Sequence, residues 1–146
     1  MRPLYESDAD LDNEASIAQM LCQQWDCKFV KLPLRYHLDF VVTRGDKAVA
    51  FAEFKTRNYT MEQINKMGGY LLSIGKWAAA IQLCEASQLP FVLVVKTIDG
   101  LYCSTFTEFK PDEVLVRGRT DRNDWQDMEP CVLLNTQRFK RIEIGN

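Results

Sequence analysis

Two carboxylates and one ammonium group, on Asp39, Glu53 and Lys55, have the types and spacing that could support chemistry. Glu53 and Lys55 stand two residues apart at the end of the apolar stretch AVAFAEFKT, and Asp39 precedes Glu53 by fourteen residues. Residues two apart in a strand face the same side, so Glu53 and Lys55 would share one face. Burying charge is unfavourable unless the charge is paired, so this strand requires a partner for its charges.

The register of a predicted hairpin decides whether Asp39 is that partner. Asp39 lies in the preceding stretch YHLDFVV, and the turn signal RGDK joins the two stretches. With a two-residue turn, Asp39 would pair with Ala52 and Glu53 would face the other side. With a loop of three or five residues, Asp39 would pair with Glu53, with Cβ atoms ~5 Å apart. We predict the odd-length loop.

Two carboxylates this close would form a metal site. They repel, and one would take up a proton unless a cation lies between them. Two acids with a backbone carbonyl and waters suit Mg²⁺, which favours few protein ligands. Lys55 could orient or activate a water, or stabilise charge that develops on a phosphate. Glu14 could add a third carboxylate if the first helix packs over the hairpin.

The elements that would position these side chains follow from periodicity and turn signals. The first half is expected to be a helix at 6–25 followed by strands at 27–32, 36–44 and 48–56. A helix then begins at the capping box at 60–63, is interrupted by Gly68-Gly69 and resumes over 70–87. Strands follow at 90–96 and 101–106, with short strands at 114–117 and 131–134 around a polar loop. On the first helix, Glu14 falls inside the apolar stripe at ~100° per residue. The order predicts one α/β domain.

Composition restricts the class of protein further. The chain has 146 residues, of which 47% are hydrophobic and 26% charged, with a net charge of −2. This balance is ordinary for one soluble domain and argues against coating nucleic acid by bulk charge, although a local basic patch stays open. No membrane span or leader is evident, so we expect no membrane association and a cytoplasmic protein. Five cysteines without a C-x-x-C pair indicate reduced thiols and no zinc site.

The sequence resembles the PD-(D/E)XK nuclease superfamily, including its small resolvase-like and phage-type members. The resemblance lies in Asp39, in Glu53-Phe54-Lys55 fourteen residues later, and in the order of elements α-β-β-β-α-β. The resemblance covers about residues 6–106 and implies a restriction-endonuclease-like core, with a central mixed sheet flanked by helices. Residues 107–146 would add C-terminal strands and a loop to the same single domain, 1–146.

The resemblance assigns roles to the three residues that introduced it. It implies that Asp39 and Glu53 are metal ligands and that Lys55 is the catalytic lysine. One departure is Leu38, which stands where the family pattern has a proline. The alternative for Glu53 and Lys55 is an ordinary ion pair at a strand edge.

Three further residues receive roles from the resemblance. The carbonyl of Phe54 would be a metal ligand, and Glu14 matches the first-helix acid of several branches, as a further ligand and catalytic residue. Lys76, on the helix after the motif, matches an auxiliary polar position. The alternatives are that Glu14 extends from the edge of its stripe to water and that Lys76 is a helix-surface residue.

The function that these residues and the resemblance together predict is a Mg²⁺-dependent deoxyribonuclease, an endonuclease that hydrolyses DNA phosphodiesters, with branched or structured DNA among its substrates. Mn²⁺ would substitute for Mg²⁺, and a homodimer would supply a second active site for two-strand cutting. The resemblance also fits a phage-encoded enzyme acting in the host cytoplasm. Two alternatives remain: a non-catalytic nucleic-acid-binding or protein-interaction module on the same fold, and an enzyme of this fold that acts on RNA.

Overall fold

A six-stranded mixed sheet forms the centre of the protein in a computed structural model, which describes residues 8–32, 38–109, 113–118 and 128–143. The strands, in sheet order, are β1 (Lys28–Lys31), β2 (Phe40–Arg44), β3 (Lys47–Thr56), β5 (Phe91–Lys96), β6 (Leu101–Phe106) and β9 (Lys140–Arg141). β3 and β5 are parallel, and the other neighbours are antiparallel. A parallel pair requires a crossover, which the chain between β3 and β5 provides. The predicted central mixed sheet is confirmed.

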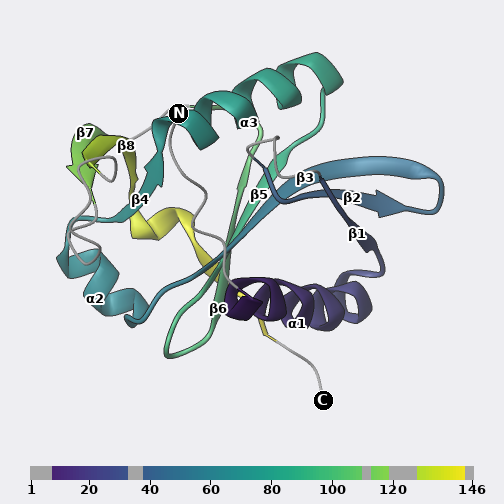
Figure 1. The fold of residues 1–146 in the computed structure, drawn as a ribbon, viewed down its shortest axis with the longest axis horizontal. Helices are drawn as coiled ribbons and strands as arrows, with labels where there is room; N and C mark the ends of the chain where they lie inside the picture. Colours follow the sequence, from purple (N-terminus) through teal and green to yellow (C-terminus); the bar gives the residue numbers. More distant parts are fainter. Residues whose placement is uncertain (1–7, 33–37, 110–112, 119–127, 144–146) are drawn as a thin grey trace.

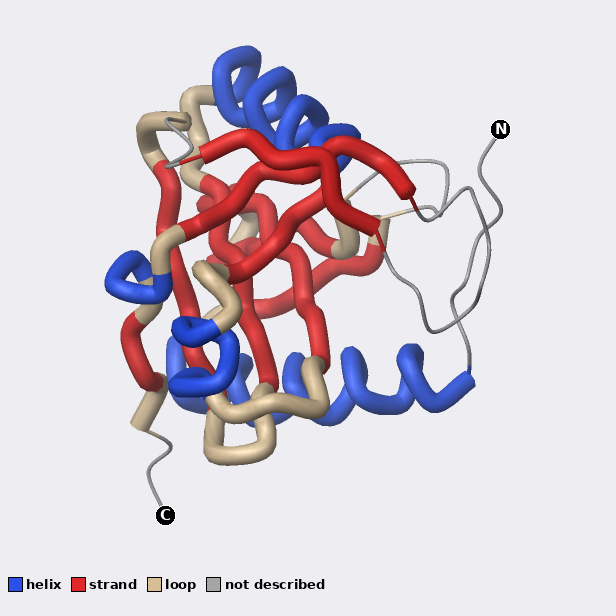
Figure 2. The backbone as a smooth tube through the Cα atoms, turned by 90° about the vertical axis from the view of Figure 1, so that its left-hand side faces the viewer, coloured by secondary structure: helices blue, strands red, loops and turns tan. Residues whose placement is uncertain are grey.

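Helices lie on both faces of this sheet (Figure 1). Helix α1 (Asp8–Trp25) covers one face, and helix α3 (Ile74–Ser87) covers the other. Figure 2 shows the strands between these two helices from the side. No helix within the described ranges is long and apolar enough to cross a membrane. The predicted α/β class and the order α-β-β-β-α-β, with helices flanking the sheet, are confirmed.

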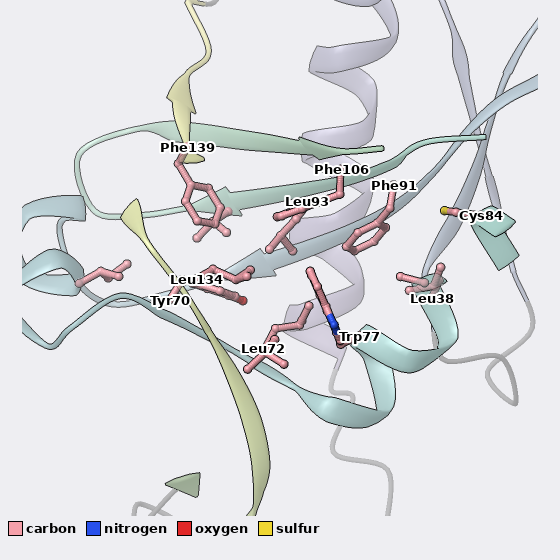
Figure 3. Packing of buried hydrophobic residues seen from close by; sticks show 14 residues of the cluster. Leu38, Tyr70, Leu72, Trp77, Cys84, Phe91, Leu93, Phe106, Leu134 and Phe139 are labelled. Atoms are coloured by element: carbon pink, nitrogen blue, oxygen red, sulfur yellow. The ribbon is translucent and has the colours of Figure 1, made fainter. Parts of the chain in front are cut away.

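Each face of the sheet has its own hydrophobic core. On the α1 side, Ile17 and Leu21 pack against Phe54 and Val94, and on the α3 side, Trp77 packs in a cluster with Leu93. Figure 3 shows Trp77 pointing from α3 into this second cluster. β5 contributes to both cores, which explains why its sequence, FVLVVK, is a continuous apolar run rather than an alternating one.

The crossover contains a strand that the sequence did not predict. Helix α2 (Met61–Lys66) begins at the predicted capping box, in which Thr60 and Gln63 exchange hydrogen bonds. The chain then forms β4 (Tyr70–Ser73), the edge of a second, antiparallel sheet with β8 (Met128–Leu134) and β7 (Glu113–Gly118). The expectation that helix resumes at residue 70 is therefore wrong, because α3 begins only at Ile74.

The glycine pair that precedes this strand lets the chain approach β8 closely. Gly68 and Gly69 both have positive φ, at 102° and 139°. A Cβ on Gly69 would stand 2.5 Å from the carbonyl oxygen of Leu134, so the chain passes β8 where only glycine fits. Tyr70 then pairs with Leu134 in the β4–β8 ladder.

The described residues leave out parts of several predicted elements. The start of the first helix, residues 36 and 37 of the second strand and the polar loop at 119–127 lie outside the described residues. After β8 the chain adds a short 3₁₀ helix, Thr136–Arg138, and β9, neither of which was predicted. The two-residue strand β9 is too short to produce an alternation pattern in the sequence.

Candidate active site

A β-bulge sets the register of the β2–β3 hairpin. Arg44 pairs with Lys47 across a two-residue turn, so the predicted odd-length loop is wrong. The register shifts by one residue beyond Thr43, because Val49 is an extra residue on β3. A bulge of this kind moves all later pairs by one position and thereby exchanges the faces of the strand.

This shift places Asp39 opposite Glu53. Beyond the bulge Phe40 pairs with Ala52, and counting one residue further in that register sets Asp39 opposite Glu53. The backbone N–H of Asp39 donates to Oε2 of Glu53 at 3.0 Å, and the backbone N–H of Phe54 donates to Oδ2 of Asp39 at 3.0 Å. One oxygen of each carboxylate is thus fixed by the backbone of the other strand, while Oδ1 of Asp39 and Oε1 of Glu53 face lysine ammonium groups.

Glu53 is a fully buried acid, with 0% of its side chain exposed. Its Oε1 lies 2.5 Å from Nζ of Lys76 and 3.3 Å from Nζ of Lys55. Burial raises the pKa of Glu53, and the two ammonium groups act in the opposite direction while the Asp39 carboxylate adds to the increase. The net direction is upward, so desolvation outweighs the two lysines, which favour the ionised form of Glu53.

Glu14 reaches the site through a lysine that sequence reasoning missed. Nζ of Lys31 lies 2.7 Å from Oε2 of Glu14 and 3.6 Å from Oδ1 of Asp39. These two oxygens are therefore at most 6.3 Å apart, the sum of the two distances. The available signal was the position of Lys31 on β1, where it pairs with Phe40, next to Asp39, but that register depends on tertiary structure.

The structure brings most of the predicted site residues together. Asp39, Glu53 and Lys55 meet as predicted, through the bulge rather than an odd-length loop, and Glu14 approaches them from α1. Lys76 does not stay on the helix surface, because its side chain, 25% exposed, turns to Glu53. Phe54 is different: its ring is buried in the α1-side core, and only its backbone belongs to the site.

The donor set suits a hard divalent cation. Within the described ranges no group of three histidine, cysteine or acidic side chains is arranged to hold a metal ion. The site instead offers one oxygen each from Asp39 and Glu53, both now neutralised by lysines. Mg²⁺ is commonly held by one or two carboxylates and keeps several waters, so two such oxygens fit its requirements.

Two comparisons with known proteins give matches. The model of a family described as "Phage putative PDDEXK endonuclease" matches residues 1–142. Among solved structures, Hjc, a Holliday junction resolvase from the archaeal hyperthermophile Archaeoglobus fulgidus, is similar with a TM-score of 0.48 and 11% sequence identity, over 64% of this chain and 74% of that one. A comparison with curated proteins gives no match.

Proposed function

Because the chain belongs to the phage PD-(D/E)XK endonuclease family, and is thus a nuclease by class, we propose that it is a divalent-metal-dependent endonuclease acting on DNA at Asp39, Glu53 and Lys55. The observation that carries this proposal is the mutual arrangement of Asp39 and Glu53, whose carboxylates each accept a hydrogen bond from the other's strand. Two acids held in this way, with Lys55 3.3 Å from Glu53, form a charged centre at the end of an apolar strand.

The residues would divide the work by their chemistry. Asp39, Glu53, Glu14 and the carbonyl of Phe54 would hold the ion, which when bound polarises the phosphate and lowers the pKa of a coordinated water. Lys55 would orient the attacking water or stabilise charge on the phosphate oxygens. Lys76 would keep Glu53 ionised, since its ammonium group opposes the effect of burial on the pKa of that carboxyl.

The wider context of the proposal follows from the same class of enzyme. Mg²⁺ is the proposed ion, with Mn²⁺ as a substitute, and linear, branched and otherwise structured DNA are the proposed substrates. We further propose one nuclease domain over residues 1–146, which dimerises when both strands are cut and acts in the cytoplasm, that of the host if the protein is phage-encoded.

Cleavage assays on several DNA structures test the proposal. Linear duplex, single-stranded and four-way-junction DNA would each be incubated with Mg²⁺, with Mn²⁺ and with EDTA. We expect metal-dependent cleavage that is lost in Asp39→Asn and lowered about 10²-fold or more in Lys55→Met. The matched controls, Asp46→Asn and Lys47→Met, remove the same charges at the exposed hairpin turn and should cleave as the wild type does.

Two results would count against the proposal in different ways. A folded wild type that cleaves none of the DNA substrates with either metal would reject it. If that protein still bound DNA, the non-catalytic module would be supported, and cleavage of RNA alone would support the RNA-acting alternative. Cleavage that survives in both Asp39→Asn and Lys55→Met would instead reject the site while leaving the enzyme class in place.

A further inference from the structure

Arg57 follows Glu53 and Lys55 along the chain, one residue beyond the end of β3. Its backbone N–H donates to the carbonyl of Lys96 at 2.8 Å, so the chain still runs beside β5 at this point. Strand alternation therefore places Arg57 on the same side as Glu53 and Lys55. Each two-residue step along a strand is ~6.7 Å, which sets Arg57 one such step beyond Lys55.

A buried tyrosine holds the guanidinium group of Arg57 in place. Its central carbon lies 5.1 Å from the ring centre of Tyr70, and its Nη1 donates to the carbonyl of Thr56 at 3.0 Å. Tyr70 is 2% exposed and packs against Phe139, with ring centres 5.7 Å apart. Figure 3 shows Tyr70 and Phe139 within the core cluster. A fixed aromatic platform orients the planar guanidinium at low cost in side-chain entropy.

The same tyrosine connects Arg57 to the candidate active site. Arg57, Glu53 and Lys76 all act on the Tyr70 hydroxyl, whose pKa is raised chiefly by burial. No well-aligned hydrogen bond satisfies this hydroxyl among the described residues, although the Arg57 guanidinium is close enough to interact with it. Arg57 and the buried carboxylate of Glu53 therefore lie around the same tyrosine hydroxyl.

Among the residues that the structure describes, Arg57 differs from the lysines of the site in having no carboxylate partner. Lys31, Lys55 and Lys76 each form an ion pair with a site acid. No ion pair joins Arg57 to an acid in the part of the chain that the structure describes. A guanidinium that is oriented by stacking and keeps most of its donors uncommitted matches the planar, bidentate geometry of a phosphate.

We propose that Arg57, supported by the ring of Tyr70, binds the DNA phosphate next to the one that is cleaved. The inference rests on the proposed function, because it takes Asp39, Glu53 and Lys55 to mark the position of the scissile phosphate. Arg57 is a binding residue in this account: it fixes the position of the strand and takes no part in bond breaking. In this account the DNA backbone follows the line from Lys55 to Arg57, at the C-terminal end of β3.

Salt-dependent DNA binding tests this role without requiring cleavage. The affinity for a fluorescently labelled DNA duplex would be measured in EDTA over a range of NaCl concentrations, for the wild type, Arg57→Met, Arg57→Lys and Lys47→Met. Lys47→Met is the matched control, since it removes one positive charge at the exposed turn, ~20 Å along β3 from Glu53. Thermal unfolding of each variant would show that it is folded.

The expected result is a change in the salt slope as well as in affinity. Arg57→Met should bind about tenfold more weakly, because a charge-assisted contact is lost. The slope of log K against log salt should fall by about 0.9, the contribution of one phosphate. Arg57→Lys should retain the slope, because it retains the charge, and Lys47→Met should match the wild type. In cleavage assays Arg57→Met should raise KM with little change in kcat.

Several outcomes would overturn the inference. An unchanged salt slope in Arg57→Met rejects it, as does a wild type that binds no DNA. If Arg57→Met does not fold, a reduced slope in Arg57→Lys rejects it instead. If the wild type cleaves DNA and Arg57→Met has an unchanged KM, the proposed nuclease is retained and only the role of Arg57 in DNA binding is rejected. If the wild type never cleaves DNA but Arg57→Met has a reduced salt slope, Arg57 is a phosphate-binding residue and the proposed nuclease is rejected.

Discussion

The replacement of Lys76 by methionine should reveal how the buried charge of Glu53 is maintained. Methionine keeps much of the length of the side chain and removes the ammonium group 2.5 Å from Oε1 of Glu53. The second ammonium group, on Lys55, stays at 3.3 Å. Lys66 provides the matched control, because its ion pair with Glu62 on α2 joins side chains that are 74% and 77% exposed.

The two replacements should differ in magnitude because the two carboxylates differ in burial. Removing one partner of a fully buried ion pair costs about 3–5 kcal/mol in the free energy of unfolding. Lys76 is 25% exposed and Lys55 remains, so we expect a smaller loss of ~2 kcal/mol near pH 8. Lys66→Met should cost less than about 0.5 kcal/mol, as is usual for exposed pairs.

The loss should also depend on pH, and its sign follows from the pKa of Glu53. Burial raises this pKa in the folded protein above its unfolded value, so the free energy of unfolding falls as pH rises between the two values. Without Lys76 the folded pKa rises further, and this window extends to higher pH. Near pH 5 Glu53 can take up a proton instead, so Lys76→Met should cost less there than near pH 8.

Urea unfolding followed by circular dichroism, in EDTA at both pH values, would measure these differences. The midpoint should shift with little change in the m-value, because the surface exposed on unfolding is the same. A loss in Lys76→Met that is no larger than in Lys66→Met, at either pH, would refute the reasoning. A loss that is large but the same at both pH values would show that the charge of Glu53 is not its cause.

Further predictions concern metal binding and the glycine pair. Mg²⁺ at a hundredfold excess over its Kd should stabilise the wild type by about 2.7 kcal/mol in thermal unfolding, with no effect on Asp39→Asn. This stabilisation should weaken as pH falls, because Glu53, whose pKa is raised, must lose its proton to bind the ion. Gly69→Ala should cost about 2 kcal/mol or more, because its Cβ would stand 2.5 Å from a carbonyl oxygen of β8. Gly75→Ala in α3, where a Cβ meets nothing within 4 Å, should be neutral or stabilising by up to ~1 kcal/mol, and equal effects in urea unfolding would contradict this account.

Features that depend on residues close together in the sequence were predicted correctly. The shared face of Glu53 and Lys55 follows from the two-residue repeat of any strand, and the start of α2 follows from its capping box. The continuous apolar run of β5 indicated burial on both faces before the two cores were known. In each case the decisive interaction lies within a few residues, so local patterns contain the information.

Elements that depend on distant partners were predicted wrongly or missed. The sequence YLLS fits a helix as well as a strand, and Tyr70 is in a strand because it pairs with Leu134, far along the chain. Lys31 was not recognised as a site residue, because its contacts with Glu14 and Asp39 join three separate elements. Tertiary packing selects among local alternatives that the sequence pattern leaves equal.

The candidate active site shows the division between the two kinds of information most clearly. The sequence alone determined which side chains could do the chemistry: Asp39, Glu53 and Lys55, two oxygen donors and a cation at the end of an apolar strand. Only the tertiary structure decided how they meet. The turn has the length that should have separated the two acids, and the extra residue Val49 restores their alignment. A single bulge exchanges the faces of a strand, and its position depends on packing across the whole sheet rather than on any local pattern.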